Sequence, residues 1–136
     1  MLKSDEKGFS LIELITVMAI IAVLIAVLAP QYLKYVNNTR VVTDVTNARE
    51  IARFLDAAVA GENGASVPTY IQGKGGTPVN GVAGMEALPY CSKDKNAEWE
   101  ITVSTSEGVE QIVLLGEIIY PDDTQGNPYY NAYYYR

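Results

Sequence analysis

The sequence predicts an α+β protein in which one long N-terminal helix packs on a small antiparallel sheet. An apolar run fills residues 9–29, an apolar stripe with helical spacing follows at 41–59, and apolar and polar residues alternate from residue 98. A period of 3.6 residues indicates a helix and a period of two indicates a strand. The 136 residues are enough for one modest domain.

The composition excludes several classes of function. The chain carries 10 basic and 16 acidic side chains and a net charge of −6, which argues against direct nucleic-acid binding, because such surfaces are basic. It has no histidine, which is the commonest catalytic base and metal ligand, and no nucleophile–base set is evident. We therefore expect no enzyme activity. The single cysteine, Cys91, cannot close an intramolecular disulfide.

The apolar run can cross a membrane as a helix. Its 21 residues extend about 31 Å at 1.5 Å per residue, and the hydrocarbon core of a bilayer is about 30 Å thick. A cleaved secretory signal fits less well, because the run is long and Pro30 would follow the best cleavage site. We expect residues 9–36 to form this helix, with a kink or local unwinding at Pro30, which removes one backbone hydrogen bond.

Glu13 is the only ionisable side chain between residues 9 and 29. An acidic side chain at the bilayer centre costs about 2.5–3.5 kcal/mol on insertion scales, so it usually has a function and a partner. The sequence therefore raises the question of what Glu13 pairs with.

The stretch Lys7–Glu13 resembles the prepilin peptidase recognition site of type IV pilins and the related pseudopilins. The stretch begins with the last residues of a short charged leader, which ends in glycine. Phenylalanine, a hydroxyl residue, two aliphatic residues and glutamate follow, and then a long apolar run. The resemblance implies that residues 1–8 are a leader, that prepilin peptidase cuts between Gly8 and Phe9, and that the new Phe9 amine is N-methylated. It also implies a pilin-like fold.

The resemblance also implies where the chain acts and with which partners. Before assembly the chain would be a single-pass protein of the cell membrane, and afterwards it would be part of a homo-oligomeric helical filament outside the cell or at its surface. The implied partners are the peptidase, which is also the N-methyltransferase, an assembly platform protein and an ATPase.

Cleavage would give Glu13 a partner. The new Phe9 amine is charged and lies four residues from Glu13, about one helical turn away. The two groups can neutralise each other within one subunit. In a stack of parallel helices, Glu13 can instead meet the Phe9 amine of a neighbouring copy, and because either charge is costly when unpaired, the pair favours one axial register.

Residues 37–136 are expected to form the globular domain. Apolar residues recur at spacings of three and four within residues 37–60, which predicts an amphipathic helix packed against a sheet. Polar residues such as Asp44 and Asp56 lie largely off this stripe. The connector at 61–97 is rich in glycine and proline and is therefore expected to be irregular, with a short edge strand at 67–72. The stripe consists of Val41, Val45, Ala48, Ala52, Leu55 and Val59.

Residues 98–136 are expected to form the sheet. Residues 98–105 alternate between apolar and polar, a turn follows at 106–108, and residues 109–120 are typical of a second strand. A two-stranded hairpin is not stable alone, so residues 129–135 are the candidate third strand. This tyrosine-rich end has two other interpretations, an exposed contact patch and, least favoured, an electron-conducting stack of rings.

The loop before the tyrosine-rich end contains oxygen ligands of the kind calcium requires, in Asp122, Asp123 and Asn127. No defined ligand spacing matches, and these residue types are common in turns. We therefore expect no cofactor and no metal, with calcium at these three residues as the weaker alternative.

Two functions fit the sequence. The first is a structural subunit of a type IV pilus, serving adhesion, twitching motility or biofilm formation. The alternative is a pseudopilin of a type II secretion or DNA-uptake (competence) apparatus. The N-terminus does not separate them, because both kinds of protein share it.

Overall fold

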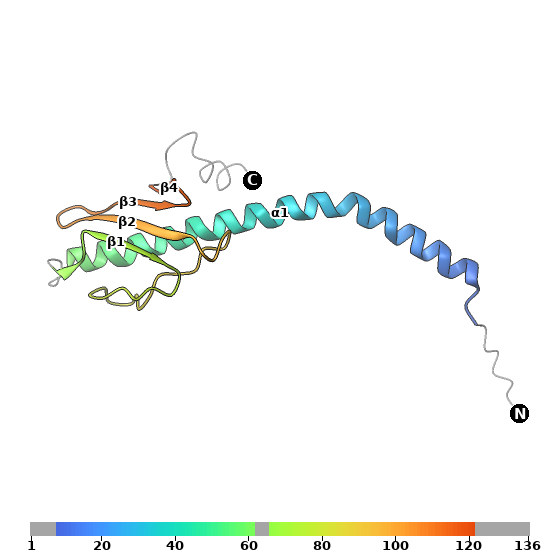
Figure 1. Ribbon diagram of the computed structural model, residues 1–136, viewed down its shortest axis with the longest axis horizontal. Helices are drawn as coiled ribbons and strands as arrows, with labels where there is room; N and C mark the ends of the chain where they lie inside the picture. Colours follow the sequence, from blue (N-terminus) through green and yellow to red (C-terminus); the bar gives the residue numbers. More distant parts are fainter. Residues whose placement is uncertain (1–7, 62–65, 122–136) are drawn as a thin grey trace, which may run out of the picture. The chain divides into compact units, whose positions relative to one another are not determined.

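The computed structural model describes residues 8–61 and 66–121 (Figure 1). Two compact units divide the chain, with the boundary inside the helix between Val36 and Asn37. The predicted α+β class is confirmed, because one long helix is followed by an antiparallel sheet. In chain order the elements are helix α1 (Leu11–Ala60) and strands β1 (Tyr70–Lys74), β2 (Glu98–Ser104), β3 (Gly108–Leu114) and β4 (Glu117–Tyr120).

The first unit contains the apolar half of α1. The helix starts after Ser10, whose carbonyl accepts hydrogen bonds from the backbone N–H groups of Glu13 at 3.1 Å and Leu14 at 3.3 Å. All its residues from 11 to 35 are exposed. By length and composition, α1 is the one helix in the described part of the chain that could cross a membrane. Pro30 lies inside α1 with helical residues on both sides, and a kink or unwinding there stays a prediction.

The second unit is a four-stranded antiparallel sheet with the C-terminal half of α1 lying along it (Figure 1). The strand order β1-β2-β3-β4 follows the sequence. Strand β2 alternates exposed and buried residues as predicted, and its Trp99 and Ile101 are fully buried. They belong to the same core as Val45, Ala48 and other helix residues, so the apolar face of α1 covers the sheet.

Residues 109–120 do not form one strand, so this prediction was wrong. They belong to β3 and β4, which a two-residue turn at Leu115 and Gly116 connects. Both turn residues have positive φ, 55° and 78°. Tight hairpins favour this geometry because it matches the twist of the strands. Leu115 extends the apolar run of β3 and therefore obscured the turn in the sequence.

Strands β1 and β4 extend the hairpin of β2 and β3 to a four-stranded sheet. Strand β1 comes from the predicted connector and pairs with β2, close to the edge strand expected at 67–72. The third strand expected at 129–135 lies outside the described residues, as do the other interpretations of that segment.

The connector is irregular but well packed. Val82, Met85 and Leu88 are buried, and the Trp99 indole donates a hydrogen bond of 2.8 Å to the carbonyl of Pro89. The connector is therefore fastened to β2 and contributes to the core.

Asp56 fastens α1 to β3 and leaves no room for a side chain at Gly108. The backbone N–H of Val109 donates to Asp56 Oδ1 at 2.7 Å. Gly108 has a φ of 92°, and a Cβ there would collide with the Asp56 carboxylate, whose Cγ would be 3.1 Å away.

We expect Gly108→Ala to lower the free energy of unfolding by about 2–4 kcal/mol, because it adds crowding to backbone strain. Gly116→Ala is the matched control. Gly116 also has a positive φ, but a Cβ there meets nothing within 4 Å, so we expect a loss of only about 1 kcal/mol. Urea unfolding of the full chain in detergent, monitored by the fluorescence of Trp99, measures the loss of stability in both variants. Equal losses would show that the contact with Asp56 contributes nothing.

Candidate assembly site and buried carboxylate

The structure brings the predicted processing and assembly residues together at the start of α1. Gly8, Phe9, Ser10 and Glu13 line one open recess. The side chain of Phe9 is 92% exposed, and a Cβ at Gly8 would meet nothing within 4 Å. The chain's own packing therefore does not require a glycine at position 8.

The Glu13 carboxylate has a hydrogen-bond partner within the unprocessed chain. Its Oε2 accepts the backbone N–H of Ser10 at 2.9 Å. Ser10 occupies the N-cap position and Glu13 the third helical position, so this bond is one half of a capping box. A carboxylate in the first turn is also favoured by the helix dipole. The spacing Ser10-x-x-Glu13 is the sequence signal that would have predicted this contact.

The capping bond does not neutralise Glu13. Its partner is a neutral N–H group, so the negative charge remains on an otherwise apolar surface. The hydroxyl of Thr16, one of the few other polar groups there, is bonded to the Ile12 carbonyl at 2.7 Å. Large exposed apolar surfaces mark contacts with membranes or other proteins. The neighbours of Glu13 are Leu11, Ile12, Leu14, Ile15, Val17 and Met18, all at least half exposed.

In the globular unit a buried carboxylate fastens the connector to α1. Asp44 is 0% exposed and accepts the backbone N–H of Ser92 at 2.6 Å and that of Lys93 at 3.3 Å. It also accepts the Cys91 thiol at 3.3 Å. We call this arrangement the Asp44 clamp. These three donors all come from the segment 91–93.

Asp44 was wrongly placed off the buried stripe. Asp44, Ala48, Ile51 and Leu55 follow one another at spacings of four, three and four, and all are buried. The spacing puts Asp44 on the stripe. The sequence could have revealed its position, but not the amide groups that make its burial tolerable, because they are 48 and 49 residues away.

Cys91 is a structural thiol. Its side chain is 1% exposed. Burial raises the pKa of the Cys91 thiol above its ordinary value of 9.0; backbone hydrogen bonding from Asp94 lowers it, and the neighbouring Asp44 carboxylate raises it. Because the thiolate is the reactive form, Cys91 is a poor nucleophile near neutral pH.

The described residues contain no group of three His, Cys, Asp or Glu side chains that could hold a metal ion. The weaker calcium candidates, Asp122, Asp123 and Asn127, lie outside those residues. A calcium site there stays a prediction.

Comparisons with known proteins concern the N-terminal region. Residues 3–29 match the family model of the prokaryotic N-terminal methylation motif. The chain is 36% identical over 58 residues to the type IV major fimbrial protein FimA of Dichelobacter nodosus. This alignment covers 43% of the chain and 37% of the relative, so it spans little more than a third of that protein. No solved structure matches the chain.

Proposed function

We propose that this chain, which carries the N-terminal methylation motif of type IV pilins and is similar to a type IV fimbrial protein, is a structural subunit of a type IV pilus. The motif and the relative confirm the resemblance drawn from Lys7–Glu13, and they support a structural subunit rather than an enzyme. In our proposal, the chain is cleaved after Gly8, N-methylated at Phe9 and polymerised. The filament would serve adhesion, twitching motility or biofilm formation.

The observation that carries the proposal is the single charge of Glu13 on the exposed apolar surface of α1. Before processing, the partner that its carboxylate has among the described residues is the neutral N–H of Ser10. Processing would add a charged amine at Phe9. If apolar helices pack together in a filament, a Glu13 carboxylate next to a neighbouring copy's Phe9 amine satisfies both charges, and other registers leave both unpaired.

The surroundings of Gly8 support processing at this position. Because a side chain at residue 8 would meet nothing, a need for glycine there must come from another molecule. A peptidase that closes around the Gly8–Phe9 bond is such a molecule. In this proposal the partners are the prepilin peptidase and N-methyltransferase, the assembly platform protein and its ATPase, and the membrane that holds the helix before assembly.

A pseudopilin of a secretion or DNA-uptake apparatus would use the same N-terminal chemistry. Electron microscopy of the cell surface distinguishes the two, because only a pilus is expected to extend well beyond the cell.

Mass spectrometry of the mature N-terminus tests the processing step. We expect a chain that begins with N-methylated Phe9. Gly8→Val is the informative variant, because the added side chain meets nothing in the structure and yet should block cleavage, leaving Met1 in place. A wild-type chain that retains Met1 would refute the proposal, and efficient cleavage of the variant would refute the recognition of Gly8.

A further inference from the structure

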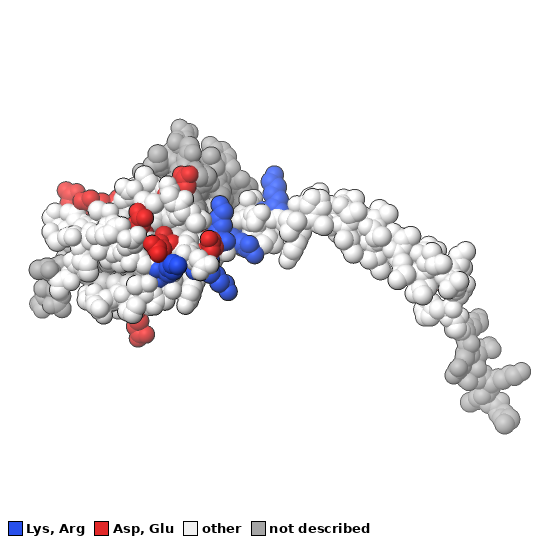
Figure 2. Space-filling model, in the orientation of Figure 1, with Lys and Arg blue, Asp and Glu red and all other residues white. Residues whose placement is uncertain are grey.

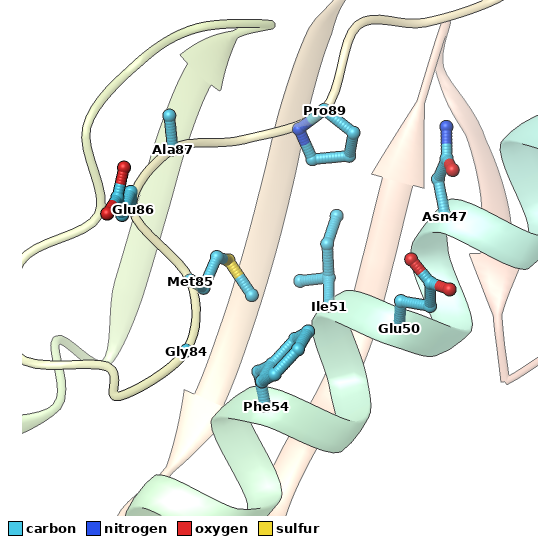
Figure 3. Close-up of a pocket in the computed structure, with 9 residues that line it drawn as sticks. All are labelled: Asn47, Glu50, Ile51, Phe54, Gly84, Met85, Glu86, Ala87 and Pro89. Atoms are coloured by element: carbon cyan, nitrogen blue, oxygen red, sulfur yellow. The ribbon is translucent and has the colours of Figure 1, made fainter.

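A groove with an apolar floor and acidic sides lies in the globular unit between α1 and the segment 84–89 (Figure 3). Ile51, Phe54 and Met85 form its floor, with Glu50 on the helix side and Glu86 on the connector side. The cavity measures about 370 Å³. We call it the acidic groove.

Phe54 is the most exposed part of the floor. Its side chain is 38% exposed, whereas Ile51 and Met85 are buried. Gly84 has a φ of 86°, and a Cβ there would come within 2.8 Å of the Phe54 ring. The connector therefore leaves room for this ring. Aromatic side chains of this kind are enriched in protein interfaces.

A basic surface lies further toward the start of the same unit. Lys93 is exposed on the segment 91–94 that the Asp44 clamp holds, and Lys95 is exposed just after that segment. Arg40 is exposed one helical turn before Asp44. In Figure 2 the Lys and Arg side chains on this face have Asp and Glu side chains among them, and Asp94 is exposed between the two lysines. We call Arg40, Lys93 and Lys95 the basic loop surface. Because the clamp fixes its backbone, little ordering is needed when this surface binds.

We propose that the acidic groove of one copy receives the basic loop surface of a second copy. Lysine side chains suit this groove, because their hydrocarbon stems can lie against Phe54 while the ammonium groups remain near Glu50 and Glu86. The chain has a net charge of −6, so two copies repel each other unless complementary regions meet.

The two surfaces differ, so the contact joins unlike parts of identical chains. Such a contact uses one surface on each copy and leaves the other free, which generates an open chain of subunits unless the rotation closes a ring. The inference rests on the proposed filament and assigns to it a contact between globular units, separate from the pairing of Glu13 with Phe9.

Cysteine cross-linking of the full chain in cells tests this contact. The variant Glu86→Cys/Lys95→Cys is oxidised and analysed by gel electrophoresis, with each single substitution as a control. We expect a ladder of multimers from the double variant and no more than dimers from either single variant, because only the double variant can link each copy to two others. Native Cys91 is 1% exposed and should not contribute. Filaments of the double variant without a ladder would overturn the inference.

Charge reversal provides an independent test. Glu50→Lys/Glu86→Lys and Lys93→Glu/Lys95→Glu should each reduce filament yield by about tenfold, whereas the combined variant should recover most of it. Glu107→Lys is the control, since this exposed glutamate lies in the β2–β3 turn, outside both surfaces. Unchanged yields in the one-sided variants, or no recovery in a combined variant with normal thermal stability, would overturn the inference.

These tests separate this inference from the proposed function. Filaments with methylated Phe9 but without cross-links would leave the pilus subunit intact and remove only the contact between globular units. An unprocessed wild-type chain would instead remove the proposed function.

Discussion

Replacing Glu13 with alanine is expected to leave the protein in the membrane and to reduce filament yield roughly a hundredfold. The substitution removes the only charge within residues 9–29, so membrane insertion becomes easier. It also leaves the processed Phe9 amine without a carboxylate in an apolar environment. A charge there costs about 2.5–3.5 kcal/mol, and 1.4 kcal/mol corresponds to a factor of ten. Immunoblots of membranes and electron microscopy of sheared filaments measure the two quantities.

Glu13→Gln separates the charge from the helix cap. Glutamine retains an oxygen that can accept the Ser10 N–H, as Oε2 of Glu13 does at 2.9 Å, but it lacks the negative charge. We expect this variant to fail in assembly nearly as severely as Glu13→Ala. Filament yield close to that of the wild type would mean that capping, rather than charge pairing, is the role of Glu13.

Replacing Asp44 with alanine is expected to lower the free energy of unfolding by about 2–4 kcal/mol. The substitution leaves the part-buried N–H groups of Ser92 and Lys93 without their acceptor. An unsatisfied donor costs about 1–3 kcal/mol when it is buried, and the lower end applies where water reaches it. The segment 91–94 should then separate from α1. Cys91, now 1% exposed, should react faster with thiol reagents at neutral pH.

Urea unfolding and thiol labelling of the full chain in detergent measure these effects. Asp44→Asn should have an intermediate effect, because its amide retains one acceptor oxygen but presents an NH₂ group where the carboxylate accepted a second bond. Glu50→Ala is the matched control, since it removes an exposed carboxylate from the same helix and should change stability by less than about 0.5 kcal/mol. If Asp44→Ala is as stable as this control, the Asp44 clamp does not stabilise the fold.

The periodic elements could be predicted from the sequence because their signals are local. Alternation of apolar and polar residues located β2, and recurrence at three and four residues located the buried half of α1. The processing motif was equally evident, because residue order and one charge in an apolar run define it.

The features that were missed depend on conformation or on distant groups. The turn at Leu115–Gly116 is defined by two positive φ angles. Its first residue, Leu115, is apolar and therefore does not indicate a turn in the sequence. Asp44 and Asp56 looked like surface residues because their partners, the N–H groups near residues 92 and 109, lie about 50 residues further along the chain. The spacing could have placed Asp44 on the buried stripe, but only the folded chain shows which N–H groups the two carboxylates accept.

The Asp44 clamp holds the segment 91–94 on α1 without a redox reaction. A carboxylate that binds backbone N–H groups needs no electron acceptor, no isomerase to correct mispaired bridges and no particular glutathione potential. The segment 91–94 can therefore be secured as soon as it meets α1, whichever side of the membrane it has reached. We therefore expect a cell without an oxidative folding pathway to fasten this segment as well as a cell that has one.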